Sequence, residues 1–486
     1  MNTKRIIQTS LCCVMLVLFL LAACDCNGSS SSKMITVETP AREAGQTDVL
    51  QLRCDPIPTV RVGFIGLGMR GPGAVKRFTY INDVEIKAIC DLEQYNLDRV
   101  QDMLTERDFP KADEYIGDEA WKQLCNRDDI DLVYICTDWE THTPMAVYAM
   151  EHGKHVAIEV PAARTIEECW QLVNTAEKTR KHCMQLENCC YDFFEMATLN
   201  MAQQGVFGEV VHVEGAYIHD LRALNFNERL SQKEAYEPGA GSAGDSEKVK
   251  RPGLKGYWDY WRLKENAEND GNLYPTHGLG PVCQILNIHR GDKMDYLVSL
   301  SSKQFNLTAY AEDRFGKDSE QAKATYLEGD MNTTLIKTAK GKSIMIQHDV
   351  ASPRPYSRIH MVSGTKGFAQ KWPKRHIALE PNAHNALSAE KMDSLLKEYE
   401  HPIVKEIGEF AKSVGGHGGM DFIMDYRLVY CLQNGLPLDQ DVYDAAEWSC
   451  ITELTKISVA NQSAPVQIPD FTRGAWDKLD GLQLAH

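Results

Sequence analysis

The sequence predicts two domains: an α/β domain with a parallel, doubly wound sheet over residues 59–185, and an α+β domain with a mainly antiparallel open sheet over residues 186–486. In the first range, apolar segments alternate with helical ones, and strands that are apolar along nearly their whole length suit a parallel sheet covered on both faces. In the second range, tight turns such as Lys340-Gly341 favour antiparallel pairing. A chain of 486 residues is long enough for two or three domains and a large core.

Four strands are expected in the first domain, each a short apolar run: Val60–Ile65, Val84–Cys90, Leu132–Cys136 and His155–Glu159. Two helix starts are expected from their capping residues. Thr143 precedes a proline suited to the first helical position, and Thr165 forms a capping box with Glu168. Helix starts placed between such strands support the α/β assignment.

In the second domain, the expected strands are Val210–Tyr217, Arg358–Ser363, and a hairpin made of Asn332–Lys337 and Ser343–His348. The segment from Gln232 to Lys255 is rich in Gly, Pro, Ser and charge, which predicts a surface loop. The pattern from Asp421 to Val459 is helical.

The most informative motif is the glycine-rich turn after the first strand. Gly66 permits the tight turn, Gly68 lets the backbone approach a pyrophosphate, and Gly71 allows the next helix to pack closely on the sheet. The second strand ends in Asp91, whose carboxylate would accept hydrogen bonds from an adenosine ribose diol and repel a 2′-phosphate. Together these features predict a Rossmann domain that binds NAD rather than NADP.

The composition limits the kinds of partner and ligand that this chain can bind. Asp and Glu number 68 against 52 Lys and Arg, and the formal net charge is −16. This balance argues against nucleic acid, because affinity for a phosphate backbone rests on basic side chains. No cysteine pair has the spacing of a metal site, and the adjacent Cys189 and Cys190 are poor disulfide partners. We therefore expect mostly buried thiols and no bound metal.

The N-terminus, residues 1–23, has the features of an export signal. Lys4 and Arg5 precede an apolar stretch, Leu11 to Leu21, that is short for a membrane span.

The sequence Leu21-Ala22-Ala23-Cys24 resembles a bacterial lipobox, which predicts cleavage before Cys24 and lipidation of its thiol. The alternative is an ordinary secretory signal with an incidental cysteine. On the first interpretation, the protein is an exported lipoprotein anchored to a membrane of the cell envelope, and residues 24–58 form a flexible tether.

Distinctive residues follow the third and fourth expected strands: Thr137 to His142, and Glu159-Val160-Pro161. Residues that leave the carboxyl ends of parallel strands line the ligand crevice of this architecture. Here the chain resembles the sugar oxidoreductase superfamily that includes glucose–fructose oxidoreductase and inositol dehydrogenase. That superfamily usually has Glu-Lys-Pro, with a lysine that assists hydride transfer, and Val160 cannot move a proton.

A narrower family also has valine in place of this lysine. The motifs that carry the resemblance are Met69-Arg70, Trp139 to His142, Glu159-Val160, Glu187-Asn188, Tyr257 to Arg262, Tyr274 to Gly280 and Gly415 to Asp421. With them the chain resembles glycoside hydrolase family 109, the NAD-dependent α-N-acetylgalactosaminidases, from Val60 to its C-terminus. It departs most at Gln232 to Lys255.

The resemblance implies two sets of contacts. The cofactor contacts fall on Met69, Arg70, Asp91, Trp139, Glu140, Thr141, His142, Glu159, Val160 and Asn188, and the sugar contacts on Tyr217, Arg262, Tyr274, Pro275, Thr276, His277 and Tyr356. The residue types suit these roles, because aromatic rings pack on sugar C–H groups, Arg262 offers a fork of donors, and His277 can exchange a proton near neutral pH.

Structural roles are the alternatives to these assignments. Trp258, Tyr260 and Trp261 could be core aromatics, and Arg262 could form a surface ion pair. A lone loop histidine such as His277 is more often structural than catalytic.

The implied reaction is oxidation of the sugar at C3 by NAD⁺, removal of the C2 proton, elimination at C1, addition of water and return of the hydride. His277, with Tyr274 or Tyr191, would move protons, although a packing role for Tyr191 is equally open. A sugar dehydrogenase is the competing activity, and a sugar-binding lipoprotein with a vestigial cofactor site is the non-enzymatic alternative. Proteins of this superfamily often form homodimers through the open sheet.

Overall fold

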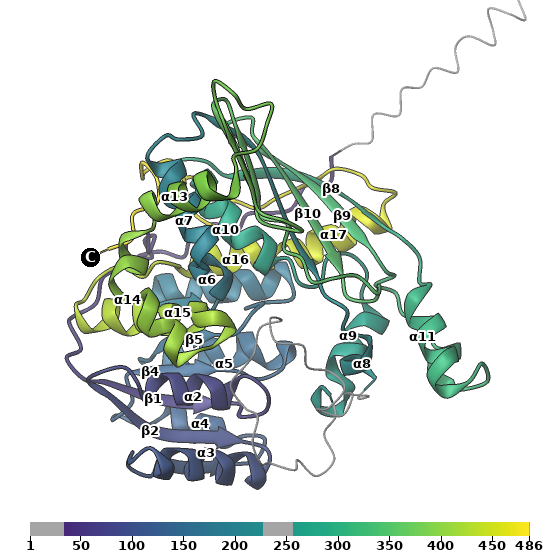
Figure 1. Ribbon diagram of the computed structural model, residues 1–486. Helices are drawn as coiled ribbons and strands as arrows, with labels where there is room; N and C mark the ends of the chain where they lie inside the picture. Colours follow the sequence, from purple (N-terminus) through teal and green to yellow (C-terminus); the bar gives the residue numbers. More distant parts are fainter. Residues whose placement is uncertain (1–33, 227–255, 486) are drawn as a thin grey trace, which may run out of the picture.

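Two sheets organise the structure, one in each predicted domain (Figure 1). The computed structural model describes residues 34–226 and 256–485. The export signal, Cys24 and the whole of the predicted Gln232–Lys255 loop lie outside these described residues. Within the two described ranges, no helix combines the length and apolar character that a membrane span requires.

The first sheet has six parallel strands in the order β3-β2-β1-β4-β5-β6, which is the order of a Rossmann domain. The strands are β1 (Val60–Ile65), β2 (Val84–Asp91), β3 (Asp113–Ile116), β4 (Leu132–Ile135), β5 (His155–Ile158) and β6 (Cys183–Gln185). The helices between them are α2 (Gly71–Phe78), α3 (Gln94–Glu106), α4 (Ala120–Cys125), α5 (Trp139–Glu151) and α6 (Ile166–Thr179). They cover both faces of the sheet (Figure 1).

The four apolar strands were predicted correctly because they are central and buried on both faces. Every residue of β4 and of β5 is buried. The two edge strands were missed for different reasons: β3 is a largely exposed Asp-Glu-Tyr-Ile segment without an apolar pattern, and β6 has only three residues.

The predicted helix start at Thr143 is wrong. Helix α5 begins five residues earlier, with Asp138 rather than Thr143 as its N-cap, because the Asp138 carboxylate accepts a hydrogen bond from the Thr141 N–H at 3.1 Å. Pro144 therefore lies inside the helix. The capping box of Thr165 and Glu168 is confirmed.

The second sheet has eight strands in the order β13-β12-β11-β7-β10-β9-β8-β14. All neighbouring strands are antiparallel except β7 and β10. The strands are β7 (Val210–Ile218), β8 (Met294–Ser301), β9 (Asn332–Thr338), β10 (Ser343–Asp349), β11 (Met361–Gly364), β12 (Gly367–Gln370), β13 (His376–Leu379) and β14 (Val466–Gln467). The mainly antiparallel open sheet is confirmed.

The strand predicted over Arg358–Ser363 is shorter in the structure, where β11 begins at Met361. Ile359 and His360 have φ of 57° and 44°, and this left-handed conformation interrupts an extended strand.

Helices fill the space between the sheets, where α7, α10 and α16 lie below the second sheet, and α14 and α15 lie beside α2 (Figure 1). The remaining helices are α7 (Phe193–Gln203), α8 (Arg222–Asn225), α9 (Trp261–Glu268), α10 (Thr276–Leu286), α11 (Asn306–Phe315), α12 (Glu320–Lys323), α13 (Ala389–Glu398), α14 (Pro402–Val414), α15 (Met420–Gln433), α16 (Val442–Ser449) and α17 (Ile451–Ala460), with short 3₁₀ turns η1 (Asn188–Tyr191), η2 (Trp258–Tyr260) and η3 (His417–Gly419).

The predicted tether is too long. From Ile35 onward the chain is bound to the folded body: the Ile35 N–H donates to the Pro465 carbonyl at 2.8 Å, and Arg42 pairs with Glu177 at 3.0 Å. Val49 is only 2 % exposed. The sequence showed no strand or helix here, but this irregular segment is fixed by long-range contacts.

The cysteines behave as expected in the described part of the chain. All eleven there are free, and nine of them are buried.

Candidate active site

The glycine-rich turn leaves room for a ligand at one glycine only. Gly66 has φ +87°, and a Cβ there would lie 2.7 Å from the backbone of Cys136. A Cβ on Gly71 would lie 2.0 Å from the Gly66 carbonyl oxygen. Gly68 has neither constraint, because a Cβ there would meet no described atom within 4 Å. Protein packing accounts for the first two glycines, and the open space at the third leaves room for the pyrophosphate contact that the sequence predicts.

Asp91 is held at the edge of this turn. Its Oδ2 accepts a hydrogen bond from the Leu67 N–H at 2.6 Å, and its Oδ1 accepts from the Glu93 N–H and the Asn96 Nδ2, each at 2.9 Å. The carboxylate is therefore fixed at the carboxyl end of β2, where an adenosine ribose would lie.

A network of charged groups joins three of the predicted cofactor residues. The Arg70 guanidinium contacts Glu159 Oε1 at 3.0 Å and Asp421 Oδ2 at 3.3 Å. Asn188 Nδ2 donates to the other Asp421 oxygen at 2.5 Å. Burial opposes the charge of Asp421, but Arg70, His417 and other cations lower its pKa well below the usual range. Asp421 was not predicted as a site residue, and its only signal was its place at the end of the Gly415–Asp421 motif.

The residues after β4 are held by hydrogen bonds to neighbouring loop residues. The His142 ring is buried between two backbone carbonyls, with Nδ1 at 2.8 Å from the Pro161 oxygen and Nε2 at 3.1 Å from the Thr137 oxygen. Thr141 bonds to Thr137 and Asp138, and Glu140 is exposed. His142 thus fastens together the loops that follow β4 and β5.

Val160 is part of an apolar cluster that contains predicted sugar contacts. Its buried side chain belongs to the same cluster as Trp139, Tyr217 and Tyr274. The position that usually holds a catalytic lysine is therefore filled by an alkyl group facing aromatic rings.

Arg262 lies at the centre of four aromatic rings. Its guanidinium carbon is 5.1 Å from the Trp139 ring centroid, 5.8 Å from Tyr217, 5.4 Å from Tyr257 and 4.8 Å from Tyr274. Nη1 donates to the Tyr257 hydroxyl at 3.1 Å, while Nε and Nη2 are buried with no hydrogen-bond partner among the described residues.

Arg262 is only 5 % exposed, so the surface ion pair is wrong. The core alternative is also wrong for Trp258 and Tyr260, which are 45 % and 46 % exposed. Trp261 is partly buried and packs edge-on against Trp139.

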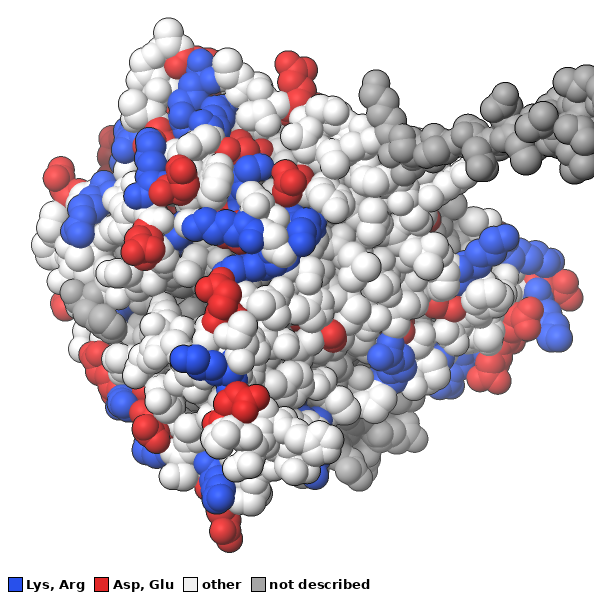
Figure 2. Space-filling model, turned by 90° about the horizontal axis from the view of Figure 1, so that it is seen from above, with Lys and Arg blue, Asp and Glu red and all other residues white. Residues whose placement is uncertain are grey.

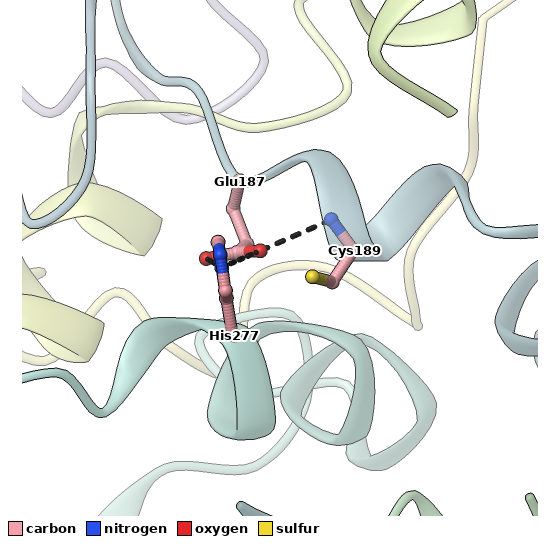
Figure 3. A group of neighbouring side chains, drawn as sticks. All are labelled: Glu187, Cys189 and His277. Atoms are coloured by element: carbon pink, nitrogen blue, oxygen red, sulfur yellow. Dashed lines mark hydrogen bonds and ion pairs between the residues drawn. The ribbon is translucent and has the colours of Figure 1, made fainter. Parts of the chain in front are cut away.

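The half-buried His277 and the buried Glu187 form a pair (Figure 3). His277 Nδ1, at the start of α10, lies 2.8 and 2.9 Å from the two carboxylate oxygens of Glu187, which follows β6. The Cys189 N–H donates to the same carboxylate at 3.0 Å. Burial works against a charge on Glu187, but His277 and the Cys189 hydrogen bond outweigh it, and the pKa of Glu187 is lowered. Sequence reasoning cited Glu187 only as part of a motif.

Glu187, Cys189 and His277 are close enough together to be considered as metal ligands. However, the carboxylate already accepts hydrogen bonds from His277 and Cys189. Burial also raises the pKa of the Cys189 thiol well above its usual range, so the thiolate that a metal prefers is disfavoured. The trio is better described as a hydrogen-bonded acid–base group.

Other predicted sugar contacts lie near this pair, whereas Tyr191, the predicted proton-transfer residue, does not. Tyr274, Pro275 and Thr276 lead into α10, and Tyr356 packs edge-on against Tyr217. Tyr191 is fully buried elsewhere, and its hydroxyl donates to Asp439 at 3.2 Å. The structure places Tyr191 in the core, as the packing alternative expected.

Comparison with known proteins gives the same division of the chain. Residues 60–186 match the model of the oxidoreductase family with an NAD-binding Rossmann fold, and residues 191–478 match the C-terminal domain of glycosyl hydrolase 109. An α-N-acetylgalactosaminidase of Bacteroides fragilis is 59 % identical over 433 residues, covering 89 % of this chain and 96 % of the relative. A glycosyl hydrolase family 109 protein of Bacteroides thetaiotaomicron is 54 % identical over 93 % of each chain.

Solved structures share the fold at low identity. A levoglucosan dehydrogenase in complex with NADH and levoglucosan has a TM-score of 0.59 at 16 % identity, covering 85 % of this chain and all of that one. A scyllo-inositol dehydrogenase of Lactobacillus casei has a TM-score of 0.55 at 14 % identity, with 84 % and 99 % covered. The chain therefore belongs to glycosyl hydrolase family 109: it is a glycoside hydrolase with an NAD-binding Rossmann domain.

Proposed function

We propose that this enzyme hydrolyses terminal α-linked N-acetylgalactosamine, or a closely related sugar. The observation that carries the proposal is the group formed by His277, Arg262 and Val160 beside the glycine-rich turn. It offers a proton-transfer group and a sugar-binding cation but has no lysine at the dehydrogenase position. The relative that is 59 % identical bears the name of this activity.

The binding of the sugar rests on Arg262 and the rings around it. The buried Nε and Nη2 groups can donate to sugar hydroxyl or acetamido oxygens. Tyr217 and Tyr274 present ring faces to sugar C–H groups, and burial raises the pKa of both hydroxyls, so they remain neutral donors.

The transfer of the C3 hydroxyl proton falls to His277. When bound, NAD⁺ accepts a hydride from C3 of the sugar and later returns it, so that the C2 hydrogen is acidic in between. His277 lies against Tyr274 and Tyr217, with ring centroids 4.9 and 5.4 Å apart, so its imidazole faces the sugar side. It can take the hydroxyl proton at C3 and give it back, while Val160 excludes water and moves no proton.

A deuterium experiment tests this function. The protein is incubated with an aryl α-N-acetylgalactosaminide in D₂O, and free sugar, C2 deuterium and NADH absorbance are followed. Free sugar carrying C2 deuterium without net NADH is expected. Stoichiometric NADH would instead indicate a sugar dehydrogenase, and neither signal would leave only binding.

For localisation, we propose that the mature chain is an exported lipoprotein anchored to a membrane of the bacterial cell envelope through Cys24. The support is the Leu21-Ala22-Ala23-Cys24 sequence after an apolar stretch. Incorporation of labelled palmitate, lost in a Cys24→Ala variant that still folds, is the expected result. Equal labelling of both forms would contradict it.

We also propose a homodimer that forms through the open sheet. Leu300 of β8 and Leu335 of β9 are 66 % and 51 % exposed, although their strands bury Leu297 and Ile336 on the opposite face. Seen from above, the area just right of the middle of the molecule carries few charged side chains (Figure 2). Light scattering is expected to give a dimer that Leu335→Glu dissociates.

A further inference from the structure

We propose that Glu187 is a positioning residue for His277: it holds the proton on Nδ1, so that Nε2 is the nitrogen that exchanges protons with the sugar. The inference deepens the proposed function and rests on it for the identity of the substrate. The tautomer itself, however, is a property of the resting protein. No contact with substrate is assigned to Glu187.

The first support is the direction of the hydrogen bond. An ionised carboxylate can only accept, so Nδ1 of His277 must be the donor at 2.8 and 2.9 Å. A neutral imidazole carries one proton, and if Nδ1 holds it, Nε2 is the free base.

The second support is that the carboxylate cannot turn away. Glu187 is completely buried, and its Oε1 also accepts from the Cys189 N–H at 3.0 Å. Its main chain is held by the Gln440 side chain, which bonds to both the Glu187 N–H and the Glu187 carbonyl. The carboxylate is thus fixed by the segment that follows β6 and by Gln440, while His277 lies in α10.

The third support is the space that α10 leaves for the pair. Gly280 lies three residues after His277 on the same helix, and a Cβ there would be 2.8 Å from Glu187 Cγ. Any larger residue at this position would push the carboxylate from its place. The glycine therefore lets Glu187 reach Nδ1.

The fourth support is the charge of the surroundings. The titratable groups around His277 are Glu187 and Cys189 from the segment after β6, Tyr217 in β7, His219 just after β7, and Tyr274 from its own segment. Arg262 faces the same tyrosines. Glu187 is the anion of this group, so it stabilises the imidazolium that forms when Nε2 takes a proton.

The test compares Glu187→Gln with Glu447→Gln in the full chain. Glu447 is a matched control, because it is also buried and its Oε2 lies 2.7 Å from Nδ1 of a different histidine, the buried His289. We expect Glu187→Gln to lower kcat/KM by about 10²-fold or more and to move the acid limb of its pH profile to lower pH, since the imidazolium loses its carboxylate.

The control and a rescue variant exclude a general packing effect. Glu447→Gln is expected to change thermal stability but leave the acid limb in place, and Glu187→Asp is expected to recover part of the activity. An unchanged profile in Glu187→Gln, or the same shift in Glu447→Gln, would overturn the proposal.

A second readout needs no substrate. In protein labelled with ¹⁵N-histidine, the signal that is missing from His277→Gln identifies His277. In the wild type this signal is expected to show a protonated Nδ1. In Glu187→Gln the His277 signal is expected to change. This result, obtained even without hydrolysis of the galactosaminide, would support the positioning role and reject only the proposed substrate. A protonated Nε2 in the resting protein would reject the positioning role itself.

Discussion

The backbone of Gly278 in α10 touches that of Gly215 in β7 so closely that a Cβ on Gly215 would lie 2.1 Å from the Gly278 carbonyl oxygen. His277 precedes Gly278, so this contact determines how near the imidazole lies to the sugar side of the site. A helix usually packs on a sheet through side chains, whereas here its backbone rests directly on the strand.

Gly215→Ala is therefore expected to push α10 from the sheet, to destabilise the protein by about 1–3 kcal/mol or more, and to reduce activity strongly. Chemical unfolding and kcat/KM measure the two effects. Gly73→Ala is the control, because its Cβ would meet only the Arg77 side chain at 3.4 Å. Normal stability of Gly215→Ala would show that the close approach is not required.

Gly68→Ala is expected to separate folding from cofactor binding. Its Cβ would meet no described protein atom within 4 Å, so the apo protein should unfold at the wild-type temperature. The methyl group would nevertheless occupy the space of the pyrophosphate, and NAD affinity should fall by about 10-fold or more. Calorimetric titration of the apo protein with NAD measures this loss. Unchanged affinity would mean that Gly68 does not face the cofactor.

Arg262→Gln is expected to raise KM about 10- to 100-fold, because each hydrogen bond from a charged donor contributes about 1.5–3 kcal/mol. The KM of Arg262→Lys should lie between those of the wild type and Arg262→Gln, since lysine keeps the charge but lacks the planar fork of donors. NAD binding should be unchanged in both variants.

Arg222→Gln serves as the matched control, because Arg222 forms an ion pair with Asp220, whose side chain is more exposed than that of Arg222. A kcat defect with normal KM in Arg262→Gln would instead place Arg262 in the chemical step.

The sequence predicted the local features of the fold and site well, for physical reasons. The glycine turn and each of strands β1, β2, β4 and β5 are encoded by a few consecutive residues. Contacts between distant segments were missed: Glu187 meets His277 across 90 positions, and Arg70 meets Asp421 across 351. No periodicity records such pairs, and the irregular segment after Ile35 is fixed in the same non-local way. The sugar-side residues were predicted only through the family resemblance.

Stability at alkaline pH should depend on His289, a buried histidine outside the site. Burial and Arg290 oppose its charge, but Glu447, Asp441 and Asp444 outweigh them and raise the pKa of His289 to about 10. Because the folded-state pKa lies above the ordinary 6.5, the stabilisation is fully present below pH 6.5 and is lost as the pH rises through 10.

Urea unfolding between pH 6 and pH 10 is therefore expected to show a falling free energy of unfolding, with a slope that approaches about 1.4 kcal/mol per pH unit for this one proton. His289→Gln should be less stable at pH 6, because it leaves three carboxylates facing only Arg290, yet it should lose less stability over the same range. The exposed His152→Gln is the control and should follow the wild type. If His289→Gln and wild type decline in parallel, the proton lost on alkaline destabilisation belongs to another group.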